Sequence, residues 1–119
     1  MDILEVLGKQ ADHAEVMTTS SETTTVRFEA NKLKAGEVEE TQGIAVRVVK
    51  DGRLGFSATT APTAVDKLIE NALASAAYGD EVPLTFPGPQ PGPKVTTYDE
   101  QIVELPIPRM VEIGQEIID

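Results

Sequence analysis

A chain of 119 residues has the size of one ordinary domain, and 40% hydrophobic with 25% charged residues is typical of a soluble globular fold. The formal net charge of -10 argues against nucleic-acid binding, because no run of Lys and Arg offsets its repulsion of phosphate. The lack of cysteine excludes disulfides and cysteine-based metal sites, and it fits a reducing cytoplasm. No apolar stretch approaches the roughly 20 residues of a membrane span, and MDILEVLGKQ lacks the pattern of a signal peptide.

The first 42 residues predict a short helix followed by three strands. Asp2, with Glu5 three residues later, has the spacing of a capping box and starts the helix. From Ala14 the apolar residues alternate with a period of two, which predicts half-buried strands rich in β-branched residues. The expected strands are 14–19, 23–30 and a more exposed 33–42, with turns at Ser20–Glu22 and at Ala30–Asn31 and a bulge or break at Gly36.

The stretch GIAVRVVKDGRLGFSATT, residues 43–60, predicts a hairpin that leads into a long helix. Asp51–Gly52 supplies the two positive-φ positions of a type I′ turn, and the returning strand places Leu54, Phe56 and Ala58 on one apolar face. Gly55, inside that strand, permits a close approach by another backbone, and the packed helix is the expected neighbour. The helix is predicted over 63–78, capped by Thr63 with Asp66 and ended by Gly79. Its apolar stripe comprises Val65, Leu68, Ile69, Ala72, Leu73 and Ala76.

The remaining residues predict an irregular segment and one more helix. Residues 80–98 are rich in Pro and Gly and form either an ordered crossing or a linker. A last amphipathic helix starts at Pro108 and runs to Asp119, and a chain that stops inside such a helix is expected to be a fragment. The expected domains are therefore an α+β domain at 1–79, a linker or crossing at 80–105, and the start of a following element at 106–119.

The predicted fold class is α+β. It is an antiparallel β-meander of four to five strands with helices packed on one face, in the order α-β-β-β-β-β-α. A C-terminal helix follows the Pro-rich crossing.

No residue pattern predicts catalysis, cofactor binding or metal binding. His13 is the only histidine and has no second His or Cys to complete a metal site. Glu37, Glu39 and Glu40 lack the loop spacing of a calcium site and are read as a solvated strand face. The hydroxyls of residues 18–25 and 57–60 have no nucleophile-elbow glycines around them, and they are read as strand formers and caps. The glycines of the hairpin do not form a phosphate-binding loop.

The run from Ala11 to Thr60 resembles the N-terminal domain of TldD/PmbA-type peptidase subunits, the modulator of DNA gyrase family. The resemblance lies in ADHAEV entering the first strand, in ANKLK at the turn, and in the order and spacing of residues 43–59. It covers residues 2–80 and extends more loosely over the rest of the chain. No single motif carries it alone.

This resemblance implies a parent several times longer than the chain. The catalytic member of the family carries His-Glu-x-x-x-His and a further ligand in its second half, binding a metal expected to be zinc, and related subunits without these ligands act as non-catalytic partners. The pair is implied to work as a cytoplasmic protease on unfolded peptides and in the maturation of microcin-type peptides. None of those ligands lies within residues 1–119, so no catalytic residue is carried over and no cofactor is expected in this part.

Two functions follow as alternatives. In the first, the chain is the inactive N-terminal domain of such a subunit, packed on its own C-terminal domain and on a homo- or heterodimer partner, and lining the peptide channel. The strand at 33–42, read as an exposed edge, would then pair with extended, unfolded peptide. In the second, the chain is a free-standing interaction module without enzymatic activity. Neither alternative involves nucleic acid or a membrane.

Overall fold

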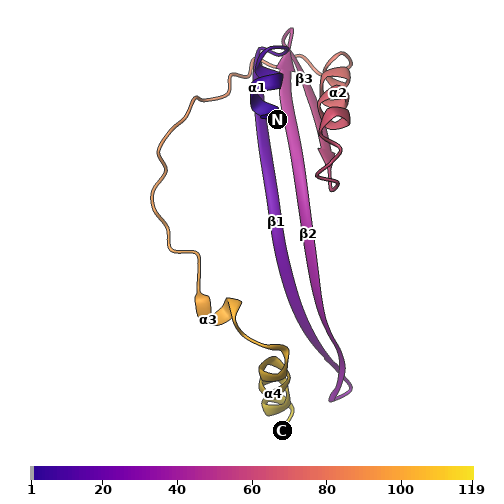
Figure 1. The fold of residues 1–119 in the computed structure, drawn as a ribbon, viewed down its shortest axis with the longest axis vertical. Helices are drawn as coiled ribbons and strands as arrows, with labels where there is room; N and C mark the ends of the chain where they lie inside the picture. Colours follow the sequence, from indigo (N-terminus) through magenta and orange to yellow (C-terminus); the bar gives the residue numbers. More distant parts are fainter. Residues whose placement is uncertain (1) are drawn as a thin grey trace. The chain divides into compact units, whose positions relative to one another are not determined.

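A computed structural model describes residues 2–119, which fold into three strands and four helices (Figure 1). The chain forms two compact units. Unit 1 comprises the chain up to Ser21 together with Thr41–Gln90, and unit 2 comprises Glu22–Glu40 with Pro91–Asp119. In chain order the elements are α1 (Ile3–Gly8), β1 (His13–Glu29), β2 (Lys32–Lys50), β3 (Arg53–Thr59), α2 (Val65–Ala76), α3 (Glu100–Val103) and α4 (Ile107–Ile118).

The sheet has three strands in the order β1-β2-β3, where the sequence pattern predicts four to five. The predicted turn at Ser20–Glu22 is wrong, because β1 continues through it and none of these residues takes the positive φ of a tight turn. The threonines around it are β-branched and suit an extended strand, and Ser21 Oγ lies 2.6 Å from Thr41 Oγ1 across to β2. A break at Gly36 is absent, since β2 is continuous from Lys32 to Lys50, and the expected bulge there stays a prediction.

Both predicted tight turns are present. Ala30 and Asn31 have φ of 53° and 62°, and Asp51 and Gly52 have φ of 53° and 77°. Successive left-handed residues are the mark of the type I′ hairpin turn. The second turn sets an antiparallel register between β2 and β3 that runs from Lys50 opposite Arg53 to Ile44 opposite Thr59.

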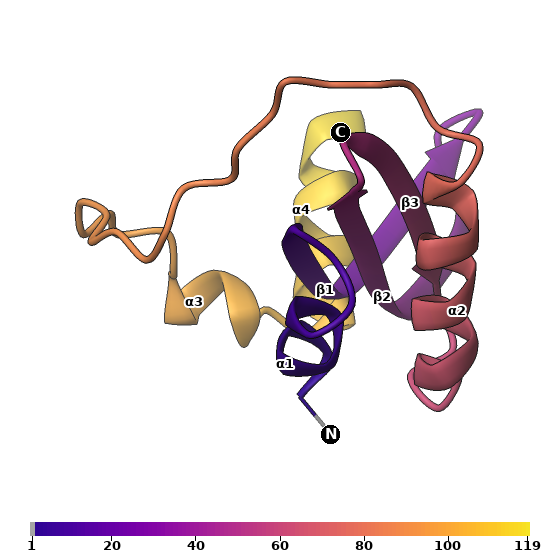
Figure 2. The ribbon, with the colours of Figure 1, turned by 90° about the horizontal axis from the view of Figure 1, so that it is seen from above.

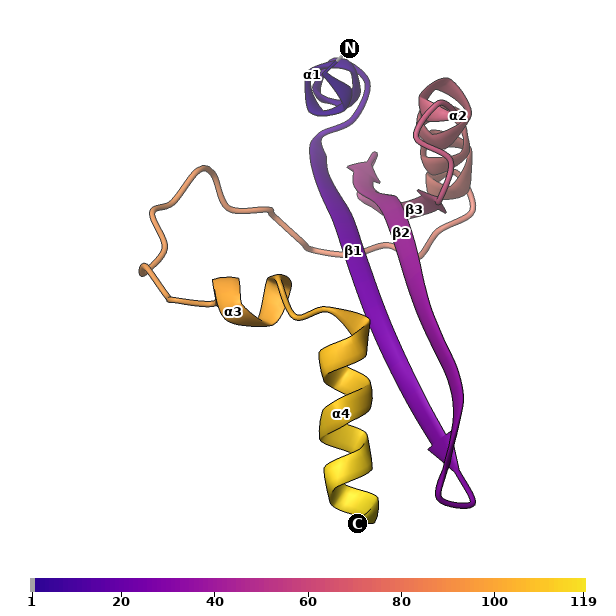
Figure 3. The same cartoon turned by 60° about the horizontal axis from the view of Figure 1, so that its bottom comes forward.

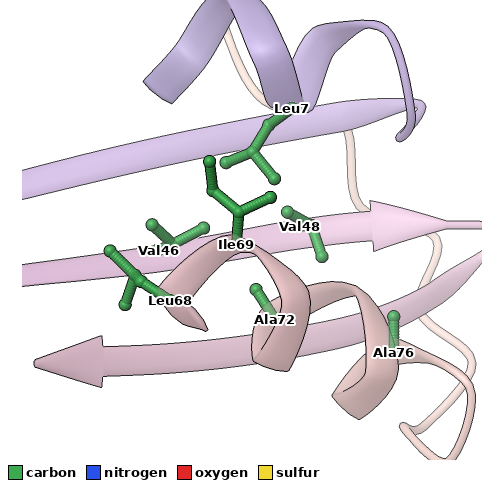
Figure 4. Close-up of a cluster of buried hydrophobic side chains, with 7 residues drawn as sticks. All are labelled: Leu7, Val46, Val48, Leu68, Ile69, Ala72 and Ala76. Carbon is green, nitrogen blue, oxygen red and sulfur yellow. The ribbon is translucent and has the colours of Figure 1, made fainter. Parts of the chain in front are cut away.

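The core of unit 1 forms where α1 and α2 cover one face of the sheet, as expected (Figure 4). The stripe of α2 supplies the largest share, and β2 contributes the alternate residues that face the helices. The buried cluster comprises Leu7, Val46, Val48, Leu68, Ile69, Ala72 and Ala76.

The face of β3 that is buried against the helices is the one opposite to Phe56 and Ala58. Gly55 and Ser57 are buried towards the helices, whereas Phe56 is 58% exposed on the opposite face with Ala58. A side chain at position 55 would overlap the backbone of α2, because its Cβ would meet the carbonyl oxygen of Ala72 and lie 2.7 Å from the amide nitrogen of Ala76. The glycine therefore allows α2 to lie directly on β3 (Figure 2), which confirms the expected close approach.

The helix termini agree with the sequence pattern at α1 and differ from it at α2. The Asp2 carboxylate accepts hydrogen bonds from the amides of Leu4 (3.0 Å) and Glu5 (3.4 Å), so it caps α1 as predicted. The predicted cap by Thr63 is wrong, because α2 starts two residues later behind Ala64, with no side-chain cap. Gly79 does not end the helix in a left-handed conformation; it lets the chain pass against the carbonyl group of Leu54.

The helix predicted at the end of the chain is present as α4, with Pro108 in its first turn. Residues 82–99 have no helix or strand, and the single turn of α3 lies at the end of the segment predicted as a linker or crossing. Within unit 2, α4 packs on the β1–β2 hairpin (Figure 3), since Gly114 lies against the ring of Phe28 and Ile107 Cγ2 would lie 3.3 Å from a Cβ at Gly36.

Candidate functional site

The edge of β2 is open along Lys32–Glu40. β3 pairs only with Ile44–Lys50, so among residues 2–119 no strand lies beside Lys32–Glu40 on the side away from β1. In the antiparallel pairing of β2 with β3, alternate residues direct their N–H groups outward from β1. Along Lys32–Glu40, too, alternate residues of β2 direct their N–H groups towards the open side. The expected edge strand is therefore present, and its backbone is available for pairing.

The carboxylates predicted as a solvated face lie along this edge. Glu37, Glu39 and Glu40 are all exposed. They make the end of the edge at residues 37–40 negative, whereas the exposed Lys32 and Lys34 are positive at its other end, and the backbone stays accessible. The chemistry that fits is an extended segment that offers backbone groups for pairing and carries basic side chains.

Unit 2 buries none of its side chains. The apolar residues of α3, α4 and the hairpin are exposed in part or in full, among them Ile102 (70%), Ile117 (82%) and Val38 (54%). A groove in the same unit is lined by Glu22, Thr24, Ile102, Val103, Leu105 and Met110. A helix that is apolar on one side needs a surface to cover that side.

On the outward side of α4, Arg109 is held by two glutamates one and two turns along. Its Nη1 lies 3.0 Å from Glu112 Oε2 and 3.5 Å from Glu116 Oε1. These hydrogen bonds, that to Glu112 first, raise the pKa of Arg109 above its ordinary value. Because an arginine is charged throughout the physiological range, no pH dependence follows, and the role of the cluster is to solvate this side of the helix.

His13 lies on the face of the unit 1 sheet that the helices leave open. Its ring centroid is 5.9 Å from that of Phe86, and the guanidinium carbon of Arg47 lies 4.9 Å from the centre of the same ring. Arg47 also forms an ion pair of 2.9 Å with Glu15. The sequence pattern missed this group, because Phe86 is a lone aromatic residue among prolines with no periodicity to place it.

The hydroxyls and carboxylates do not converge on a reactive centre. Ser21 and Thr41 bond to each other, and Thr59 Oγ1 accepts a hydrogen bond from the amide of Ala61. Over residues 2–119 the structure brings together no group of three or more His, Asp or Glu suited to a metal ion. The residues present therefore do not fit a zinc site, and ligands for one would have to come from elsewhere. None of the helices in the described part is long and apolar enough to cross a membrane.

Comparison with known proteins places the fold. The family model of PmbA/TldA metallopeptidase domain 1 matches residues 14–76. The chain superposes on the crystal structure of TldE from Thermococcus kodakarensis with a TM-score of 0.76 and 21% identity, covering 97% of this chain and 28% of that one. It superposes on a Thermotoga maritima protein described as a modulator of a DNA gyrase with a TM-score of 0.74 and 22% identity, covering 95% and 26%.

No curated protein matches the sequence. The chain spans about a quarter of the length of each of the two solved structures. At their level of sequence identity, the similarity of this chain to them shows a shared fold. The family match covers more than half of the chain, and it includes both turns and all of α2. The chain therefore belongs to the PmbA/TldD metallopeptidase family and carries its first, N-terminal domain.

Proposed function

We propose that this chain is the non-catalytic N-terminal domain of a TldD/PmbA-type metallopeptidase subunit that acts on unfolded peptides. In this proposal the domain packs against the rest of the subunit and places a strand edge at the peptide channel. The observation that carries this proposal is the surface of unit 2, where a helix and a hairpin are formed but no side chain is buried.

Docking follows from the energetics of that surface. Ordering a residue costs about 1–2 kcal/mol of backbone entropy, and burial of apolar area is the main term that offsets it. Unit 2 leaves much of its apolar area in water, including Ile102 and Ile117. A second apolar surface is therefore needed to cover α4, and the occupant that we propose is the subunit's own C-terminal domain, together with a homo- or heterodimer partner.

The proposal assigns bond cleavage to another part of the enzyme. Zinc, cytoplasmic location and dimerisation belong to the proposed parent. The net charge of -10 supports a partner other than nucleic acid.

Peptide pairing follows from the open edge of β2. An extended peptide beside Lys32–Glu40 would gain backbone hydrogen bonds, and the exposed glutamates would favour basic side chains. We expect an unstructured peptide rich in Lys and Val to shift amide resonances of the isotope-labelled chain along this edge.

Separate proline substitutions at the neighbouring positions Val38 and Glu39 test the edge, because one of two adjacent strand residues directs its N–H towards the open side. Proline is tolerated where the N–H faces solvent and removes one donor that the peptide needs, whereas at the other position it breaks a bond to β1 and lowers the stability in urea. In the variant that keeps its stability, we expect peptide affinity to fall about two- to tenfold, the value of one backbone hydrogen bond. Titrations followed by NMR measure the effect.

Alanine at the same position, Val38→Ala or Glu39→Ala, is the matched control, because it removes the same side chain and keeps the N–H. Equal affinity in the proline and alanine variants, or amide shifts confined to surfaces away from β2, would reject the edge as the peptide site. Docking of α4 is tested separately by hydrogen exchange.

A further inference from the structure

The segment after α2 is fixed to unit 1 at its start. The amide of Leu54 donates to the carbonyl oxygen of Asp80 (3.0 Å), and the amide of Val82 donates to that of Gly52 (2.8 Å). The side chain of Arg53 adds a hydrogen bond to the carbonyl oxygen of Gly79 and an ion pair with Glu81. These contacts attach residues 79–82 to the start of β3.

Phe86 provides a second point of contact, on the open face of the sheet. That face is identified by Arg47, which alternates with the buried, helix-facing Val46 and Val48. Phe86 is half-buried, with the guanidinium of Arg47 over its ring and His13 beside it. An aromatic face beside a guanidinium is a favourable cation–π arrangement.

Val49 shows that this face is covered between the two points of contact. It alternates with Val48 and so lies on the open side, outside the helix-facing core, yet it is only 2% exposed. Neither α1 nor α2 lies on that side of the sheet. A cover of Val49 must therefore come from the opposite side, and residues 83–85, which join the two points of contact, are placed to supply it.

We propose that residues 80–86 form a strap across the open face of the unit 1 sheet, latched by Phe86 on Arg47 and His13. Opening the latch uncovers a patch that combines Val49, the exposed Phe56 and the Arg47 guanidinium. The strap makes unit 1 a three-layer structure of helices, sheet and strap. This inference is independent of the peptide edge and of the docking of α4.

The lone histidine makes the latch directly observable. Because the chain has one His, its imidazole protons give unambiguous NMR signals, and the ring current of Phe86 displaces them. We expect Phe86→Leu to move the His13 signals towards their values in an unstructured peptide. Tyr98→Leu, at an exposed residue, is the matched control and is expected to leave them unchanged.

A second variant probes the cation without altering the strap. Arg47→Met should raise the rate of chymotryptic cleavage after Leu84 about two- to fivefold, since cleavage follows the population of the open strap. Arg27→Met, at an exposed arginine of unit 2, is the control. His13 signals that do not move in Phe86→Leu, or cleavage rates that are equal in Arg47→Met and Arg27→Met, would overturn the latch.

Discussion

Replacement of Gly55 by Val is expected to destabilise the chain by about 2–3 kcal/mol. A β-branched residue at a strand position would by itself favour the strand by up to about 1 kcal/mol. At this position the steric term decides, because a Cβ would meet backbone atoms of Ala72 and Ala76, which cannot rotate away. The helix would have to lift from β3, and the contacts of Leu68 and Ala72 in the core would open with it. Urea unfolding followed by circular dichroism measures the loss.

Gly92→Val is the control for this substitution. A Cβ at Gly92 has nothing within 4 Å, and its φ is not in the left-handed region, so a stability within about 0.5 kcal/mol of the parent chain is expected. If Gly55→Val were as stable as Gly92→Val, the close packing of α2 on β3 would be contradicted.

Amide hydrogen exchange should separate α2 from α4 by about a thousandfold or more in the 119-residue chain. Amides of α2 lie over the buried cluster and exchange through global unfolding, which costs at least about 5 kcal/mol in a stable domain. Amides of α4 belong to a helix with no buried residue and open locally at little cost. Exchange rates read residue by residue by NMR give both values in one sample.

The same measurement on the proposed longer subunit tests docking. There the amides of α4 are expected to gain protection, because the proposed C-terminal domain covers the helix. Matching rates for α4 in the short chain and in the subunit would rule out docking through this helix. Protection of α4 equal to that of α2 in the short chain would show that its apolar side needs no cover.

The sequence correctly predicted the features that depend on residues close together in the chain. Asp51–Gly52 specified a left-handed turn, Asp2 specified a helix start, and the stripe of α2 specified a buried helical face, and all three are present. The family resemblance rested on the same stretch and is confirmed by the match over residues 14–76. The domain boundaries at residues 79 and 105 stay predictions.

The errors occur where a partner segment decides the outcome. Ser20–Glu22 has the composition of a turn, but a strand lying alongside keeps it extended. The apolar face of β3 was read from Leu54 and Phe56, whereas the helix selected the side with the smallest residue, Gly55. The pattern of one segment does not reveal which of its faces packs against another segment. The contact of Phe86 with Arg47 was not predicted for the same reason.

The two turns have a consequence for how the sheet assembles. Each strand pairs only with its neighbour in the chain, and each junction is a two-residue loop, so closing it costs little chain entropy. Pairing can then spread outward from Ala30–Asn31 and from Asp51–Gly52 without waiting for distant segments to meet. Contacts between residues near in sequence are associated with rapid folding, and here even the longest strands would form by zippering from a fixed starting point.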